Sequence, residues 1–114
     1  MAESPLIFKI CTSAEWDRAV AAGRFFGSPV DCRDGFIHFS AAHQVSETAA
    51  RHFADQTDLM LIAVDPIALG SDLRWEKSRG GDLFPHLYGS LPTAAAVHSG
   101  PLQKDADGHV IVPK

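Results

Sequence analysis

The chain has 114 residues, of which 46% are hydrophobic and 21% are charged, so it is long enough to fold as a single domain with its own core. Its formal net charge of -4 excludes the broad basic field that attracts duplex nucleic acid or an anionic membrane surface. The longest apolar run, residues 59–64, is far shorter than a membrane span.

The two cysteines indicate the redox environment. Cys11 and Cys32 lack the close spacing of a metal site, and no secretory leader pattern precedes them. We therefore expect free thiols and a cytoplasmic location, because thiols stay reduced in the cytosol.

The first predicted element is a strand over residues 5–11, which are rich in β-forming side chains. Thr12 and Glu15 have the spacing of a capping box and begin a helix, for which Gly23 offers a C-terminal stop. Glycine, proline and aspartate then predict a loop over residues 24–35.

Within this loop, Phe25 and Phe26 are expected to be anchors or the edge of a lid. A second strand is predicted over residues 36–39, and Ser40 is the expected N-cap of a second helix. The apolar face of that helix repeats at helical spacing and consists of Ala42, Val45, Ala49 and Phe53.

Strands dominate the second half of the sequence. Residues 59–64 are apolar throughout and predict a central strand that is covered on both faces. Residues 73–77 and 83–88 flank a glycine turn and predict a hairpin, in which Pro85 favours an edge strand or a bulge.

Two more strands are predicted over residues 94–102 and 109–112, on either side of a turn at residues 105–108. Two helices in the first half and mostly strands in the second half predict an α+β fold, with residues 1–114 forming a single domain.

Three short segments place polar side chains among apolar ones: Gly35–Ser40, Leu73–Glu76 and Phe84–Gly89. Burial of an imidazole or a carboxylate is unfavourable unless the group finds a partner. We therefore expect the polar side chains of these segments to converge on one cleft beside the sheet.

In the first segment, His38 offers one donor and one acceptor, which suits it to hold a ribose hydroxyl or transfer a proton; the alternative is a core histidine bonded to a backbone carbonyl. Ser40 lies two residues on and shares its strand face. As a helix cap, Ser40 would leave the amides of residues 41–44 to bind an oxyanion, within reach of Gln44. Lys9 on the first strand is a further candidate for ligand binding.

In the second segment, Arg74 and Glu76 share one strand face. A functional interpretation makes Glu76 an acid/base or the residue that orients a ribose, and makes Arg74 the partner of an anionic group. The alternative is a surface salt bridge, which contributes little to stability.

In the third segment, His86 and Tyr88 share a face that suits stacking on a flat ring such as a base; the alternative is a hydrophobic face with a polar rim. A two-residue turn at Gly80-Gly81 would place Trp75 opposite His86. A shift of one residue would instead bring Glu76 onto the face of His86, so the hairpin register decides whether the two side chains meet.

The order of these segments resembles a known family. The segments are a strand ending at Thr12, a helix with Trp16 and Gly23, then Gly-Phe-Ile-His-Phe-Ser, Val-Asp-Pro, Leu-Arg-Trp-Glu and Phe-Pro-His-Leu-Tyr-Gly. Over residues 6–102 this order is similar to domain-of-unknown-function family 952, small bacterial proteins grouped with the ADP-ribosyltransferase-like fold. The resemblance implies a bent, split mixed sheet with NAD as a candidate cofactor in its cleft.

Residues 37–40 are also similar to the His-x-Ser segment of the NAD-dependent RNA 2'-phosphotransferases within that group. The first strand departs from the group, because Lys9-Ile10-Cys11-Thr12 stands where a His-Gly-Thr or His-Gly-Ser signature is usual.

Three hypotheses follow. The first is a transferase that acts on NAD or a related nucleotide, or a degenerate relative that still binds one, with His38, Glu76 and His86 as catalytic residues. The second is a non-catalytic module that binds a small anionic metabolite. The third is a metal-assisted hydrolase with the same three residues on zinc, ranked last because the sequence lacks close His-x-His or His-x-x-x-His spacing. The candidate ligand-binding residues are Ser40, Gln44, Arg74, Tyr88 and Lys9.

Overall fold

The computed structural model describes residues 5–113, apart from the side chain of Arg79, and has the predicted α+β composition. Its strands are β1 (Ile7–Thr12), β2 (Arg24–Phe25), β3 (Ile37–His38), β4 (Ser40–Ala41), β5 (Leu59–Val64), β6 (Leu73–Lys77), β7 (Leu83–Leu87), β8 (Leu91–Pro92) and β9 (Ala96–Pro101). Its α-helices are α1 (Ser13–Ala22), α2 (Pro29–Asp34) and α3 (Val45–His52), and 3-10 helices cover Pro66–Asp72, Arg79–Gly81 and Thr93–Ala95.

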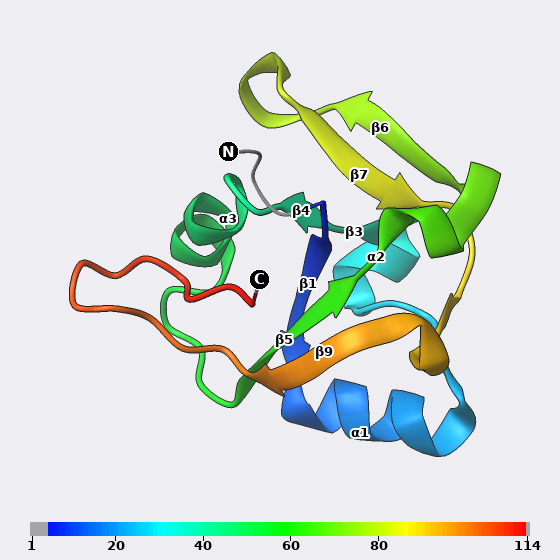
Figure 1. Cartoon of the computed structure of the whole chain (residues 1–114), viewed down its shortest axis with the longest axis horizontal. Coiled ribbons are helices and arrows are strands. Elements are labelled where there is room, and N and C mark those ends of the chain that lie inside the picture. Colours follow the sequence, from blue (N-terminus) through cyan, green and yellow to red (C-terminus); the bar gives the residue numbers. More distant parts are fainter. Residues whose placement is uncertain (1–4, 114) are drawn as a thin grey trace.

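The strands are divided among three sheets, with the orders β4-β1-β5-β9, β3-β7-β6 and β2-β8. Every strand pair in the described part of the chain is antiparallel, so the expectation of a mixed sheet is wrong. In Figure 1 the β6–β7 hairpin projects at the top, and α1 lies at the opposite end of the molecule, below β1, β5 and β9.

The core lies on both faces of β5, as its apolar run predicted. On one face Ile62 and Val64 pack in a cluster that includes Trp16 of α1. On the other face Leu61 and Ala63 pack in a second cluster with α3 and the C-terminal segment. Each fully buried large aliphatic side chain contributes about 1.5–3 kcal/mol, so this strand anchors both layers.

Helix α1 begins and ends where its local signals predict. The side chain of Thr12 accepts the N–H of Glu15 at 3.1 Å, and the carboxylate of Glu15 accepts the N–H of Thr12 at 2.8 Å. Gly23 ends the helix with φ of +82°, a conformation that is unfavourable for residues with a Cβ.

The predicted loop over residues 24–35 contains more structure than expected. It holds the short strand β2 and the helix α2, whose first residue is Pro29 and whose carboxylate Asp31 accepts the N–H of Ser28 at 2.8 Å. Phe25 is buried in the core rather than at a lid edge, whereas Phe26 is 67% exposed.

Ser40 does not cap a helix, which corrects the sequence prediction. It lies in β4 opposite Phe8 of β1, and α3 begins five residues later at Val45. A turn separates the two elements, because the N–H of Gln44 bonds to the carbonyl of Ala41 at 2.9 Å. Pairing with β1 therefore extends the strand past the position where the local pattern favours a helix.

The β6–β7 hairpin closes through a five-residue connection, residues 78–82, rather than through a two-residue glycine turn. This places Arg74, not Trp75, opposite His86 and brings Glu76 onto the same face as His86. No bulge is needed for this register.

Pro85 lies in a central strand, contrary to the prediction of an edge or a bulge. The strand tolerates it because β3 pairs with β7 only at His86 and Leu87. The carbonyl of Pro85 still accepts the N–H of Phe39 at 3.0 Å, so only its missing N–H goes without a ladder partner on that side.

The predicted strand over residues 109–112 is reduced to one isolated bridge between Lys104 and Val110. The turn before it is held by the Asp105 side chain, which accepts the N–H groups of Asp107 and His109 at 2.9 and 3.0 Å. The predicted turn is thus present without the strand that should follow it.

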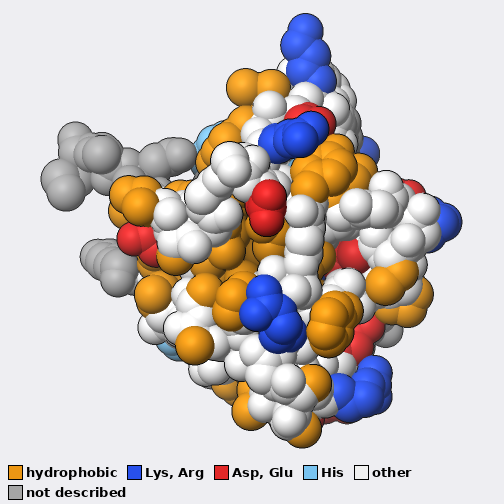
Figure 2. Space-filling view, turned by 90° about the vertical axis from the view of Figure 1, so that its right-hand side faces the viewer, with side chains coloured by type: hydrophobic (Ala, Val, Ile, Leu, Met, Phe, Trp, Pro, Cys, Tyr) orange, Lys and Arg blue, Asp and Glu red, His pale blue; other side chains and the backbone are white. Residues whose placement is uncertain are grey.

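On the face seen in Figure 2, basic and acidic side chains are interspersed with apolar ones, and neither sign of charge dominates. Among the described residues, no helix is long and apolar enough to cross a membrane.

Candidate functional site

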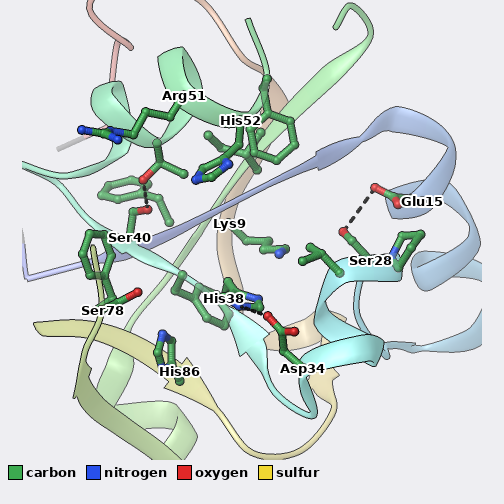
Figure 3. Close-up of a pocket in the computed structure, with 18 of the residues that line it drawn as sticks. Lys9, Glu15, Ser28, Asp34, His38, Ser40, Arg51, His52, Ser78 and His86 are labelled. Carbon is green, nitrogen blue, oxygen red and sulfur yellow. Dashed lines mark hydrogen bonds and ion pairs between the residues drawn. The ribbon is translucent and has the colours of Figure 1, made fainter. Parts of the chain in front are cut away.

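A pocket of about 960 Å³ lies beside β1, with α2 on one side and α3 on the other (Figure 3). It forms because β4 pairs with β1 only at Ile7 and Phe8, so no strand continues beside the rest of that edge within residues 5–113. The pocket occupies the position that a longer β4 would fill. Its volume falls in the usual range for sites that bind small molecules, about 300–1,000 Å³.

The floor of the pocket carries an unpaired piece of strand. Ser13 donates its N–H toward the β5 side, to Asp58 at 2.8 Å, whereas the N–H of Thr12 is bound by Glu15. Hydrogen-bonding groups alternate in direction along an antiparallel strand, so Ile10 directs its N–H and C=O to the pocket side. Among the described residues, these two groups have no partner on a neighbouring strand, so one hydrogen-bond donor and one acceptor face the pocket.

One wall of the pocket contains a network centred on Asp31. Its carboxylate contacts Lys9 Nζ at 2.7 Å and His38 Nδ1 at 2.6 Å, and it also accepts the backbone N–H of His38 at 3.1 Å. The other ring nitrogen of His38, Nε2, lies 3.0 Å from Asp34 Oδ2. Helix α2 therefore supplies carboxylates to both nitrogens of the imidazole.

Burial alone would raise the pKa of Asp31, but its bonds from His38, Lys9 and Ser28 outweigh burial and lower the pKa to about 2. The carboxylate is thus ionised in the folded protein and holds the buried ammonium of Lys9. At Asp34, the hydrogen bond from Arg33 leads the causes that lower its pKa.

The opposite strand, β7, supplies the second imidazole. His86 Nδ1 lies 2.8 Å from Glu76 Oε1, and the same oxygen accepts the hydroxyl of Tyr88 at 2.7 Å. His86 lines the pocket and is labelled at its lower edge in Figure 3. Its Nε2 has no hydrogen-bond partner among the described side chains.

The hydrogen bond from Tyr88, followed by that from His86, lowers the pKa of Glu76. The same contact raises the pKa of Tyr88, because a neighbouring carboxylate opposes ionisation of the phenol. The guanidinium of Arg74 lies 4.8 Å from the centre of the Tyr88 ring.

Phe36 joins the two histidine environments. Its ring stacks on His86 with centroids 4.1 Å apart and contacts His38 at 4.6 Å and Tyr88 at 5.2 Å. The two imidazole centroids are 5.5 Å apart, because His38 and His86 are directly paired across β3 and β7.

The remaining pocket wall carries cations and hydroxyls. Figure 3 shows Arg51 and His52 on the α3 side, and Ser28 on the α2 side near Glu15. Phenyl rings complete the lining: Phe8, Phe39, Phe53 and Phe84.

The structure brings together part of the predicted site. His38, Ser40, His86 and Lys9 line the pocket. Glu76 and Tyr88 do not line it: Glu76 contacts Nδ1 of His86, and the hydroxyl of Tyr88 donates to Glu76. The hydroxyl of Ser40 bonds to that of Thr48 at 2.9 Å rather than capping a helix.

Besides Tyr88, two predicted ligand-binding residues lie away from the pocket. The buried side chain of Gln44 accepts the N–H of Ala41 and donates to the carbonyl of Leu83, so it fixes the turn and cannot reach a ligand. The N–H groups of Ala41 and Gln44 are both bonded within this turn, so neither is an open amide at a helix start. Arg74 is exposed and covers Tyr88 instead of entering the pocket.

The sequence analysis missed the two aspartates of α2 and the ring of Phe36. A signal existed, because Ser28 and Asp31 have capping-box spacing with a proline at the first helical position. That pattern predicts a helix start inside the segment that we expected to be a loop. The sequence predicted that Phe36 lies in a strand, but it could not show which aromatic rings contact this side chain.

The zinc ligand set of the third hypothesis is not assembled. Among the described residues, the single group of three metal-type ligands with converging atoms is Asp105, Asp107 and His109 in the exposed C-terminal turn. His38 and His86 instead direct their Nδ1 atoms to different carboxylates.

Comparison with known proteins identifies the family. Residues 10–99 match the family model described as "Protein of unknown function (DUF952)". The chain is 53% identical to Protein CC0527 from Caulobacter crescentus, whose crystal structure superposes with a TM-score of 0.86 over 93% of each chain. The solution NMR structure of CC0527 gives a TM-score of 0.81 over 93% of this chain and 91% of that one. No curated protein matches. The chain therefore belongs to the DUF952 family, as the order of its motifs predicted.

Proposed function

We propose that the pocket binds a nucleotide-like anion and that the protein is a nucleotide-dependent transferase. The observation that carries this proposal is an oriented imidazole in a pocket whose lining carries three cationic side chains beside two carboxylates. Glu76 holds Nδ1 of His86, and the ring faces a space that Arg51 and Lys9 also border. A fixed imidazole with one open nitrogen is suited to proton transfer on a bound ligand.

Shape and polarity support a nucleotide as the ligand class. The phenyl rings of the lining suit stacking on a base. Arg51 suits a phosphate, which would share its guanidinium with Glu47, whose carboxylate lies 2.8 Å from Nε. The open N–H and C=O of Ile10 suit a group with one donor and one acceptor, such as a carboxamide or a base edge. The resemblance to the ADP-ribosyltransferase-like fold makes NAD and ADP-ribose the first nucleotides to test, and that fold assignment is part of the proposal.

A non-catalytic binding module is the second candidate, and one observation favours it. Both ring nitrogens of His38 contact carboxylates, so this imidazole has no nitrogen left for a substrate while Asp34 stays in place. In that case the pocket would retain a small anion without converting it.

Titration of ¹⁵N-labelled protein with NAD, ADP-ribose and inorganic phosphate tests the proposal. We expect amide shifts around Ile10, Arg51 and His86, and weaker binding in Arg51→Ala. Arg18→Ala removes the same charge from an exposed site on α1 outside the pocket and should bind normally. If none of the three compounds shifts the pocket amides at millimolar concentration, the nucleotide proposal is wrong.

A further inference from the structure

The two histidines of the pocket have different hydrogen-bonding environments. We propose that they form a base and acid pair, with His86 as the general base and His38 as the general acid, and that the group on which they act is a phosphodiester. This inference rests on the proposed nucleotide pocket and assigns the reacting group within it.

His86 is arranged as the base. A carboxylate without a proton can only accept, so the 2.8 Å contact with Glu76 places the proton of the neutral ring on Nδ1. The lone pair is then on Nε2, which has no partner among the described side chains. Because the ring of Phe36 stacks on it, His86 keeps this orientation.

His38 is arranged as the acid. Asp31 lies 2.6 Å from Nδ1 and Asp34 lies 3.0 Å from Nε2, and two ionised carboxylates on one imidazole require a proton on both nitrogens. The two contacts differ in accessibility, because the side chain of Asp31 is 1% exposed and that of Asp34 is 32% exposed. A ligand oxygen can therefore replace Asp34 at Nε2, while Asp31 stays bonded to Nδ1.

Other charged groups face this pair from the neighbouring elements. Lys9 of β1 forms an ion pair with Asp31 and favours its ionised form, and Arg33 contacts Asp34 at 3.0 Å. Tyr88 donates to Glu76 behind His86, and Arg74 lies over the Tyr88 ring. His38, the proposed acid, thus lies among ion pairs, whereas His86, the proposed base, contacts a single carboxylate.

A phosphodiester matches this pair better than a glycosidic bond does. In its displacement a nucleophile loses a proton while the leaving oxygen gains one, which needs one neutral and one protonated group on the same centre. The 5.5 Å between imidazole centroids lets both rings contact oxygens of one tetrahedral phosphorus. Glycoside transfer instead uses two carboxyl groups on opposite sides of the sugar.

The step is balanced without a further reactant besides water or an acceptor alcohol. His86 Nε2 takes a proton from the incoming hydroxyl, and its oxygen forms a bond to phosphorus. The bond from phosphorus to the leaving oxygen breaks, and that oxygen receives the Nε2 proton of His38. With water, the products are a phosphomonoester and an alcohol, and the proton returns from His86 to His38 through solvent.

The first experiment measures cleavage of bis(4-nitrophenyl) phosphate and of a nucleoside 2',3'-cyclic monophosphate in the presence of EDTA. We expect cleavage with a bell-shaped pH profile, because one imidazole must be neutral and the other protonated. His86→Ala and His38→Gln should each lower kcat by about 10²–10⁴-fold. His98→Ala, an exposed histidine outside the pocket, should retain full activity.

Glu76→Gln tests the positioning role of Glu76. Loss of the carboxylate should lower kcat with little change in KM and should shift the acid limb of the pH profile. A merely structural role would change neither limb. Circular dichroism of every variant confirms that it is folded before rates are compared.

Imidazole ¹⁵N chemical shifts provide a second measurement that does not depend on turnover. At neutral pH we expect both nitrogens of His38 to be protonated and Nε2 of His86 to be unprotonated. A neutral His38 overturns the assignment. Binding of ADP-ribose or NAD without cleavage of either phosphodiester also overturns it but leaves the proposed pocket intact, whereas failure of nucleotides and phosphate to bind removes both.

Discussion

The two carboxylate–histidine pairs of the pocket are opposite in burial. In the pair on α2 and β3, the Asp31 side chain is 1% exposed and that of His38 is 34% exposed. In the hairpin pair, the His86 side chain is 6% exposed and that of Glu76 is 36% exposed. The carboxylate is therefore the buried member of the first pair, whereas the imidazole is the buried member of the second pair.

Because of this difference, we expect the two carboxylates to contribute unequally to the stability of the fold. A buried carboxylate must be compensated, and Asp31 is compensated by a buried ammonium, so removing either charge leaves the other without a partner. A half-exposed carboxylate such as Glu76 keeps water as an alternative partner. We expect changes at Asp31 to affect folding, and changes at Glu76 to affect mainly its neighbours His86 and Tyr88.

The largest expected effect comes from Asp31→Ala. Breaking a buried ion pair by removing one partner costs about 3–5 kcal/mol, since Lys9 is left buried without its partner. For a domain of this length we expect the melting temperature to fall by roughly 10 °C or more, measured by calorimetry. Asp34→Ala removes the more exposed carboxylate of the same helix and should lower the melting temperature far less. Equal losses in both variants would contradict the comparison.

An intermediate effect is expected from acid. Because the pKa of Asp31 is about 2 in the folded state, below its value near 4 in the unfolded chain, its contribution is full above about pH 4 and is lost as pH falls toward 2. The shift corresponds to about 2 kcal/mol. Urea unfolding of Asp31→Asn at several pH values should show a shallower decline in this window. If the free energy of unfolding of the variant falls with pH as steeply as that of the wild type, the acid sensitivity comes from other groups.

The smallest expected effect is a change in the titration of Tyr88, which is the single tyrosine of the chain. Since the Glu76 carboxylate raises the pKa of this phenol, Glu76→Gln should lower it toward the ordinary value of about 10. Ultraviolet absorbance of phenolate follows this residue alone. We expect the melting temperature of the variant to stay close to that of the wild type, and an unchanged phenol titration would place Tyr88 away from Glu76 in solution.

Several features were predictable because they depend on neighbours in the sequence. The capping box of Thr12 and Glu15 and the apolar run of β5 identified their elements, since caps and hydrophobic runs act over a few residues. The polar residues in apolar frames drew attention to His38 and His86, and both side chains line the pocket. The DUF952 assignment also followed from motif order alone.

Tertiary structure decided the remainder, because it depends on which distant segments pair. Pairing with β1 drew Ser40 into a strand, although its local context favours a helix cap. The length of the hairpin connection set the register that joins Glu76 to His86. The ion pair between Lys9 and Asp31 links segments with no shared local pattern, and only the tertiary fold brings the two charges together. The sequence shows which polar side chains would need a partner if they were buried, whereas the tertiary structure determines which residue becomes that partner.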